Sequence, residues 1–229
     1  MSASAAQRQL VLDLGHDASY AREDFIRGEA NATALALIDR WPDWPDRAVV
    51  VVGPEGSGKS HLAAIWAARS GARGIAAAAL GEADLPDLLA PGALVIENLG
   101  PGDGLDERAL FHLLNLVREE RASLLITARS LPAGWTLQTP DLASRLRALP
   151  VVSLAPPDER LLRALLIKLA ADRQLDLDDS VVNYLIVRVE RSFAGVQQAI
   201  ARLDHAAMQQ KRPVTRALAA ALFRDETPR

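Results

Sequence analysis

Residues 53–60 read GPEGSGKS and combine three glycines with a lysine and a serine at a fixed spacing. A short apolar run, residues 48–52, precedes them, and a stretch with helical spacing follows. In a strand–loop–helix setting, glycines let successive backbone N–H groups turn toward phosphate oxygens, and the helix N-terminus adds partial positive charge. The spacing G-x-x-x-x-G-K-[ST] therefore predicts a site for a nucleoside di- or triphosphate.

Each polar side chain of this loop has an expected task. Lys59 should reach the β- and γ-phosphates, and the Ser60 hydroxyl should ligate Mg²⁺. The alternative is a glycine-rich turn with a chance lysine, which the flanking strand and helix disfavour. The predicted nucleotide-binding residues of the loop are Gly53, Pro54, Glu55, Gly56, Ser57, Gly58, Lys59, Ser60 and His61.

A second apolar run, ALVIENLG at residues 93–100, ends in Glu97 and Asn98. In nucleotide-hydrolysing sites of this kind, an acid at such a strand end holds Mg²⁺ and a neighbouring acid orients the attacking water. Glu97 suits the metal and a catalytic role, but neutral Asn98 accepts no proton, so we expect slow intrinsic hydrolysis. Alternatively, Glu97 only ends a strand and pairs with Lys59 in the empty site.

The remaining sequence indicates how these residues are positioned. Further strand candidates, GIAAAAL, SLLITAR and PVVSL, alternate with helical stretches, which predicts a parallel, doubly wound α/β sheet. From residue 156 onward the apolar spacing is helical throughout, which predicts about four helices. We expect a flexible tail at residues 1–18, an α/β nucleotide-binding domain at 19–155 and a small helical domain at 156–229.

Composition limits the classes of function. The net charge of -3 gives no reason to expect nucleic acid as the main ligand, and zero cysteines exclude disulfides and thiolate metal sites. The four histidines lack ligand spacing. No apolar stretch reaches the roughly 18 residues of a membrane span, and no signal peptide is evident, so we expect a cytoplasmic protein without membrane contact.

Four stretches together resemble the DnaA-type AAA+ family, and within it the regulatory inactivators of DnaA, the Hda group. They are SYAREDFIRGEANATAL (19–35), GKSHLA (58–63), TPDLASRLRAL (139–149) and ERSFAGVQQAI (190–200). The resemblance covers nearly the whole chain. It implies an AAA+ P-loop NTPase fold in which the α/β domain is followed by a helical lid.

The resemblance also implies roles for single residues. It places Phe25, Ile26 and Asn31 on the adenine side of the pocket, an arginine finger at Arg145 and a nucleotide-sensing arginine at Arg191. Each arginine also has an alternative interpretation. Arg145 could be a solvated surface charge, and Arg191 could belong to an ion pair where a helix begins.

Thr127 lies at the end of SLLIT, where this fold commonly places a polar residue near the γ-phosphate. Strand-end capping is nearly as good an interpretation. In DnaA a DNA-reading domain follows the lid, whereas this chain ends at residue 229, so we expect no direct sequence-specific DNA binding. The Glu97–Asn98 pair, where the initiator has two acids, further weakens any transfer of full ATPase activity.

QLVLDL, residues 9–14, is an apolar patch on the predicted tail. In an extended peptide alternate side chains share a face, so the leucines lie together. The patch resembles the peptide with which bacterial replication proteins dock on the DNA sliding clamp, the β subunit of DNA polymerase III. The residues implied in clamp binding are Gln9, Leu10, Leu12 and Leu14. Alternatively, the patch is an edge strand packed on the body.

The expected function is regulation of replication initiation. The protein would dock on the clamp, hold ADP or ATP with Mg²⁺, and present Arg145 to the ATP of a neighbouring DnaA. Two alternatives are a self-sufficient DNA-dependent ATPase of helicase-loader type and a nucleotide-gated clamp adaptor. The sequence leaves open the resident nucleotide and the oligomeric state, including a homodimer.

Overall fold

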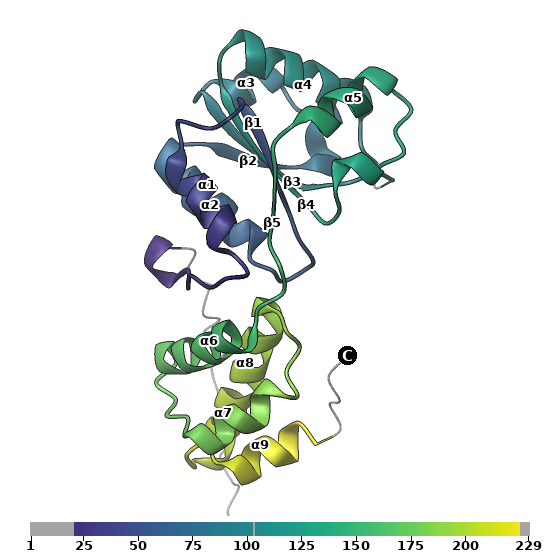
Figure 1. Cartoon of the computed structure of the whole chain (residues 1–229). Coiled ribbons are helices and arrows are strands. Elements are labelled where there is room, and N and C mark those ends of the chain that lie inside the picture. Colours follow the sequence, from purple (N-terminus) through teal and green to yellow (C-terminus); the bar gives the residue numbers. More distant parts are fainter. Residues whose placement is uncertain (1–20, 103, 225–229) are drawn as a thin grey trace, which may run out of the picture.

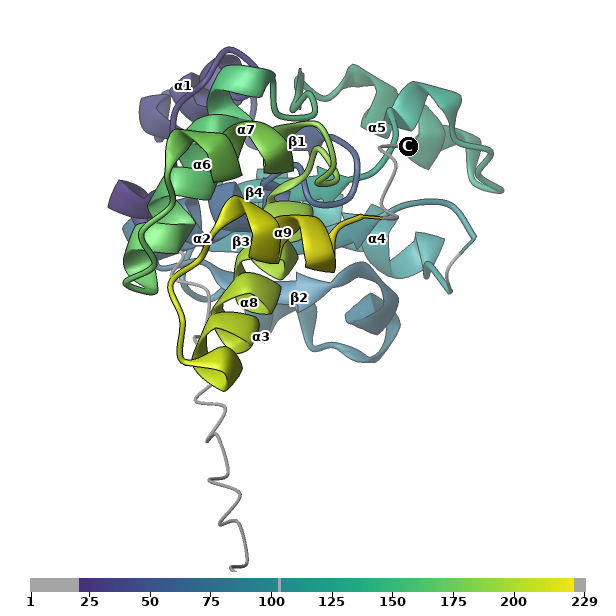
Figure 2. The same ribbon diagram turned by 90° about the horizontal axis from the view of Figure 1, so that it is seen from below.

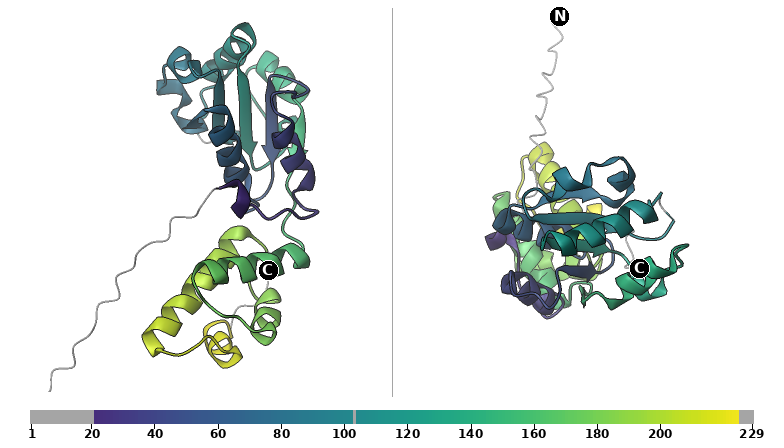
Figure 3. Two further views of the ribbon diagram at one scale, coloured as in Figure 1. Left: turned by 90° about the vertical axis from the view of Figure 1, so that its left-hand side faces the viewer. Right: turned by 90° about the horizontal axis from the view of Figure 1, so that it is seen from above.

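The computed structural model describes residues 21–102 and 104–224. An α/β lobe comes first in the chain, and an all-helical lobe follows it (Figure 1). The helical lobe lies below the sheet, as seen from the side in the left panel of Figure 3 and from below in Figure 2. None of the helices in the described part of the chain is long and apolar enough to cross a membrane.

The α/β lobe contains a five-stranded sheet in which every pairing is parallel, in the order β2-β3-β4-β1-β5. The strands are β1 (Ala48–Val52), β2 (Arg73–Ala76), β3 (Ala93–Leu99), β4 (Ser123–Ala128) and β5 (Val151–Ser153). This confirms the predicted parallel α/β sheet. Since β1 lies between β4 and β5, the crevice at its carboxyl end is where such sheets bind ligands.

Successive residues of β1 pack on opposite faces of the sheet, because side chains alternate along a strand. Val49 and Val51 join the core beneath α1 (Ala32–Arg40) and α2 (Lys59–Ser70). Val50 and Val52 join the core on the other face. The helices on that face are α3 (Leu85–Leu89), α4 (Glu107–Glu119) and α5 (Pro140–Ala148), and Figure 1 shows the two layers on either side of the sheet.

One strand prediction is too long. The candidate GIAAAAL gives a strand only as far as Ala76, and Ala77–Glu82 forms a 3₁₀ helix, η2. β2 is an edge strand with a partner on one side, and alanine has little preference for strands, so nothing sustains the pairing beyond Ala76. The turn instead buries Leu80 in the core with α4.

The helical lobe consists of α6 (Glu159–Asp172), α7 (Asp179–Ile186), α8 (Phe193–Gln210) and α9 (Arg216–Leu222). Its apolar faces form a core of their own. Each helix begins after a residue whose side chain accepts a hydrogen bond from a first-turn N–H, which compensates donors that have no intrahelical partner. These N-cap residues are Asp158, Asp178, Ser192 and Thr215.

The connection between the lobes is short and hydrogen-bonded. After β5, the Leu154 N–H donates to the Val52 carbonyl (2.7 Å), and the Ala155 N–H donates to the Ala30 carbonyl (3.1 Å). Two prolines then lead to Asp158, the N-cap of α6. The helical lobe therefore starts beside the residues that follow β1, where the phosphate loop lies.

Candidate nucleotide-binding site

The phosphate loop joins β1 to α2 at the carboxyl edge of the sheet. Gly58 is the N-cap of α2, and Lys59 and Ser60 are its first residues, so the helix N-terminus faces the loop. Gly53 lies against the connection to the helical lobe, where an added Cβ would come within 2.8 Å of the Leu154 carbonyl oxygen. The loop thus has backbone donors, a lysine and a helix terminus at one point, the arrangement that binds phosphates.

Gly56 brings the loop against α8. Its φ of +69° is in the left-handed region, and an added Cβ would lie 2.7 Å from the Ser192 Cβ. The Gly56 carbonyl accepts a hydrogen bond from the Phe193 N–H at 2.8 Å. The first turn of α8 therefore rests directly on the phosphate loop.

Replacing Gly56 by alanine should disturb this contact. We expect a loss of about 1–3 kcal/mol in the free energy of unfolding, because a Cβ strains the left-handed backbone and meets Ser192. Thermal unfolding measures the loss, and calorimetry with ADP should show weaker binding. Gly74→Ala is the control, since a Cβ there meets nothing within 4 Å. If Gly56→Ala and Gly74→Ala are equally stable, the close contact between Gly56 and Ser192 does not constrain the loop.

Lys59 is buried beneath the loop, and its ammonium donates to the carbonyls of Gly53 (2.8 Å) and Pro54 (2.7 Å). Desolvation by burial lowers the Lys59 pKa, and the nearby positive charge of Arg129 lowers it further, against an opposing effect of Glu55. The alternative pairing of Lys59 with Glu97 is not seen: the ammonium bonds the two carbonyls, and the Glu97 carboxylate accepts from the Ser60 hydroxyl.

Arg129 is a site residue that we did not predict. It follows β4 and forms an exposed ion pair with Glu55 of the phosphate loop, with an Nη2–Oε2 distance of 3.2 Å. In the sequence, Arg129 could have been noticed only because it directly follows the strand SLLITA, which ends in Thr127 and Ala128. Finding it required knowing that β4 is the neighbour of β1 in the sheet.

Ser60 and Glu97 lie together, as expected for a shared metal ligand set. The Ser60 hydroxyl donates to Glu97 Oε2 at 3.1 Å, so α2 and the end of β3 meet here. A hydroxyl beside a carboxylate fits Mg²⁺, which prefers oxygen ligands and keeps several waters.

Asn98 and Thr127 lie beyond Glu97. Asn98 has a φ of 57°, at an irregularity in the β3–β4 pairing, and its N–H donates to the buried Thr127 Oγ1 at 3.0 Å. The Thr127 hydroxyl thus accepts a hydrogen bond from the backbone of the neighbouring strand, β3, near the end of that strand.

The adenine-side residues lie in the segment before α1. Phe25 packs in the sheet core with Val49 and Leu62, whereas the next residue, Ile26, packs against the core of the helical lobe. Asn31 is buried and both ends of its amide are bonded: Oδ1 accepts from the Gly28 N–H, and Nδ2 donates to the Ile26 carbonyl, each at 2.9 Å. Asn31 therefore shapes the segment that supplies Phe25 and Ile26.

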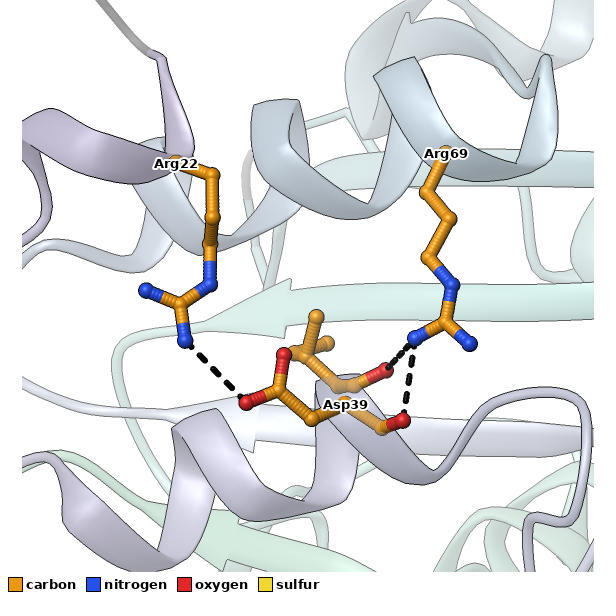
Figure 4. A network of polar contacts seen from close by, with 4 residues as sticks. Arg22, Asp39 and Arg69 are labelled. Atoms are coloured by element: carbon orange, nitrogen blue, oxygen red, sulfur yellow. Dashed lines mark hydrogen bonds and ion pairs between the residues drawn. The ribbon is translucent and has the colours of Figure 1, made fainter.

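A polar network holds this segment on the α/β lobe (Figure 4). Arg22, in the 3₁₀ helix η1 (Arg22–Asp24), forms an ion pair with Asp39 at the end of α1 (3.1 Å). Arg69 of α2 donates to the Ile38 and Asp39 carbonyls, at 3.5 and 2.9 Å. These bonds join η1, α1 and α2, which keeps Asp24 and Phe25 beside the phosphate loop.

His61 lies at the centre of the adenine side. Its Nε2 is 3.0 Å from the Ala21 carbonyl oxygen; a carbonyl only accepts, so this nitrogen carries the proton. The ring makes edge contacts with Phe25 (centroids 5.1 Å apart) and with Phe193 of α8 (6.4 Å). His61 thus connects the start of the described chain, the phosphate-loop helix and the helical lobe.

The pKa of His61 gives a pH dependence. Burial lowers this pKa, while the Ala21 carbonyl and the charge of Asp24 oppose the shift and Lys168 adds to it. Because the unfolded value is higher, about 6.5, the unfolded chain binds the proton first as the pH falls. The free energy of unfolding should therefore decrease below about pH 6.5 until the folded pKa is reached. Urea unfolding at several pH values measures this slope, and His61→Gln should flatten it; equal slopes in both proteins would contradict the assignment.

A narrow crevice joins these parts. The part of it open to the centre of a water molecule has a volume of about 30 Å³. Its lining combines the segment before α1, the phosphate loop and the helical lobe: Asp24, Phe25, Ile26, Asn31, Gly56, Ser57, Gly58, His61, Pro157, Leu161, Leu165 and Phe193. The predicted adenine-side residues and the loop are therefore brought together, with α6 and α8 closing the far side.

The two predicted functional arginines lie in different places. Arg191 is exposed directly before Ser192, the N-cap of α8, next to the phosphate loop. No ion pair holds it within residues 21–102 and 104–224, so the ion-pair alternative is wrong for that part of the chain. Arg145 of α5 is half-buried: it donates to Asn115 Oδ1 and lies 4.4 Å from the Phe111 ring centroid.

Arg145 is therefore an anchored side chain, and the alternative of a solvated charge is wrong. It lines a small cavity with Arg47 and Ala48, at the amino end of β1, whereas the phosphate loop is at the carboxyl end. The structure does not bring Arg145 into this chain's own site. The patch with Gln9, Leu10, Leu12 and Leu14 lies outside the described residues.

Comparisons with known proteins agree with this architecture. Residues 158–219 match the family model described as "Hda, lid domain". Domain III of the replication initiation protein DnaA from Thermotoga maritima has a TM-score of 0.74 at 19% identity, covering 91% of this chain and 97% of that one. For AMPPCP-bound DnaA from Aquifex aeolicus the TM-score is 0.68 at 18% identity (83% and 66%). For the Thermotoga maritima RuvB Holliday junction branch migration motor it is 0.68 at 15% identity (90% and 72%).

At these identities the structural likeness shows the fold. The α/β lobe with its phosphate loop and the helical lobe correspond to the AAA+ core and lid of DnaA and RuvB. The family match covers most of the helical lobe. The chain therefore has the DnaA-type AAA+ fold, and residues 158–219 of its helical lobe match the Hda lid domain.

Proposed function

We propose that this chain is a nucleotide-binding regulator of replication initiation that acts on DnaA. The observation that carries the proposal is the meeting of three parts in one crevice: the phosphate loop, the segment with Phe25 and Ile26, and an Hda-type lid. A ligand in this crevice touches both lobes, so it sets their relative position.

The ligand proposed is ADP or ATP with Mg²⁺. Backbone N–H groups of the loop and the Lys59 ammonium bind the phosphates, and Phe25 and His61 contact the base beside apolar residues of α6. Ser60 and Glu97 hold Mg²⁺, which neutralises phosphate charge when bound. AMPPCP in the similar DnaA structure supports an adenine nucleotide here.

The nucleotide serves mainly to hold the lobes together. Asn98 is neutral where a second acid would orient the attacking water. Intrinsic hydrolysis should therefore be slow, as in GTPases that lack an added arginine, at roughly 10⁻³ s⁻¹ or below.

The action on DnaA is proposed to occur in trans. Arg145 lies away from this chain's own phosphate loop and is held by Phe111 and Asn115. An arginine held in this way suits the charge that develops on a partner's transferring phosphoryl group. Docking on the sliding clamp through Gln9, Leu10, Leu12 and Leu14 brings the protein to its partner.

The proposal is tested by two measurements on the full chain. Isothermal calorimetry with ADP and ATP, each with and without Mg²⁺, should show binding with one site per chain. A reconstituted assay with DnaA, ATP and clamp loaded on DNA should show faster hydrolysis of DnaA-bound ATP. No heat with either nucleotide, or no acceleration, would contradict the proposal; rapid DNA-dependent turnover by the isolated chain would favour a helicase-loader-type ATPase.

A further inference from the structure

An ion pair joins the two lobes at the rim of the crevice. Lys168 of α6 contacts Asp24 of η1, with an Nζ–Oδ1 distance of 2.7 Å. Both side chains are largely withdrawn from water, with 25% and 26% of their surfaces exposed. Within the described residues, this is the one ion pair that connects the α/β lobe to the helical lobe.

The pair lies where a base must enter. Asp24 itself lines the crevice, together with Leu161 and Leu165 of α6, the helix that carries Lys168. Because Asp24 and α6 line the same crevice, opening it for a base to enter or leave moves α6 and the segment around Asp24 apart. That separation stretches the Asp24–Lys168 contact.

The charges around the pair favour a fixed geometry. Burial alone would lower the Lys168 pKa, but its hydrogen bonds to Asp172 and Asp24 raise it above the ordinary value. Asp172, one turn along α6, accepts from Lys168 at 2.8 Å. The ammonium is thus held between a carboxylate of its own helix and one of the opposite lobe, which limits the side-chain entropy lost when the lobes close.

Two backbone hydrogen bonds also link the lobes. The Ala155 N–H donates to the Ala30 carbonyl where the lobes connect, and the Phe193 N–H donates to the Gly56 carbonyl at the phosphate loop. Asp24, Gly56 and Phe193 line the crevice, so the ion pair and the second of these bonds lie at its edge. The ion pair alone can be removed by exchanging a side chain, so its contribution can be measured separately.

We propose that Asp24 and Lys168 are positioning residues that hold α6 closed over the bound nucleotide and set its rate of release. This inference rests on the nucleotide binding proposed above. In the closed state the pair resists the separation that a leaving base requires, so it slows dissociation while contributing little to the initial encounter. The dwell time of the nucleotide then determines how long the two lobes keep one arrangement.

The test measures release of a fluorescent ADP analogue from the full chain after mixing with excess unlabelled ADP. Asp24→Asn and Lys168→Gln should each accelerate release about 5- to 20-fold, with the association rate changed less than about threefold. Lys168→Arg should keep release as slow as in the wild type, because a guanidinium can also bond the carboxylates of Asp24 and Asp172. The double variant Asp24→Asn with Lys168→Gln should be no faster than either single one, since one interaction is lost in each.

The matched control is Asp172→Asn, which removes the other carboxylate at Lys168 but leaves the link between the lobes. Its release rate should stay within about twofold of the wild type. If wild-type protein binds the analogue but Asp24→Asn and Lys168→Gln release it at the wild-type rate, or Asp172→Asn accelerates release equally, the inference is wrong while nucleotide binding stands. If wild-type protein binds neither the analogue nor ADP, both proposals fail.

Discussion

Lys59→Ala should weaken ADP binding by about 100-fold or more. A hydrogen bond from a charged donor contributes about 1.5–3 kcal/mol, and each 1.4 kcal/mol is a factor of ten in affinity, so the two or so phosphate contacts of one ammonium account for this loss. Lys59 is buried at the loop with its ammonium on the Gly53 and Pro54 carbonyls, and a phosphate bound in the loop would take the place of these contacts. Isothermal calorimetry gives both affinities.

The control for lost positive charge is Arg118→Ala, an exposed residue of α4 on the opposite face of the sheet. It should bind ADP like the wild type. Thermal unfolding of apo Lys59→Ala separates a folding defect from a binding defect, because the substitution also removes the two carbonyl bonds within the loop. Unchanged affinity in a folded Lys59→Ala protein would exclude the phosphate loop as the nucleotide site.

Arg145→Ala should abolish the proposed acceleration of ATP hydrolysis in DnaA. Arginines supplied in trans contribute roughly 10³–10⁵ in rate, or about 4–7 kcal/mol of barrier, so stimulated hydrolysis should fall to the rate of DnaA alone. Binding of ADP to the variant itself should be unchanged, because Arg145 lies near the amino end of β1, away from the loop. Phosphate release in the reconstituted assay and calorimetry measure the two effects.

Arg147→Ala is the matched control, since Arg147 is an exposed arginine of the same helix, α5. It should keep most of the stimulation. Arg145→Lys should not restore it, because an ammonium lacks the planar donors that contact Asn115 and a phosphoryl group together. Stimulation at the wild-type level by folded Arg145→Ala would refute the trans arginine, and equal losses in both variants would point to a general defect of α5.

Much of the fold could be predicted because its signals are local. The run of four valines in β1 is apolar on both faces, as in a strand covered by helices on each side, and the glycines and lysine after it have few other uses in that context. The four helices of the second lobe follow from apolar spacing and from capping residues such as Asp158 and Ser192. The end of β2 was misjudged because alanine runs carry little periodicity.

The candidate site was predictable only in part. Lys59, Ser60 and His61 lie in one contiguous motif, and the acid at Glu97 follows from a strand end. Arg129 was not predicted as a site residue, because it lies near Glu55 only when β4 is the neighbour of β1 in the sheet. Phe25 and Ile26 came from a family resemblance, and their division between two cores was visible only in the folded chain.

The sequence by itself determined the elements, the phosphate loop and the class of fold, because these depend on residues close together along the chain. Only the tertiary structure decided which distant side chains meet. It placed Asp24 against Lys168 across the crevice and Arg145 at the opposite end of β1 from the loop. The physical reason is that strand order and the seating of α6 and α8 depend on the summed burial of many apolar residues, which no short segment encodes.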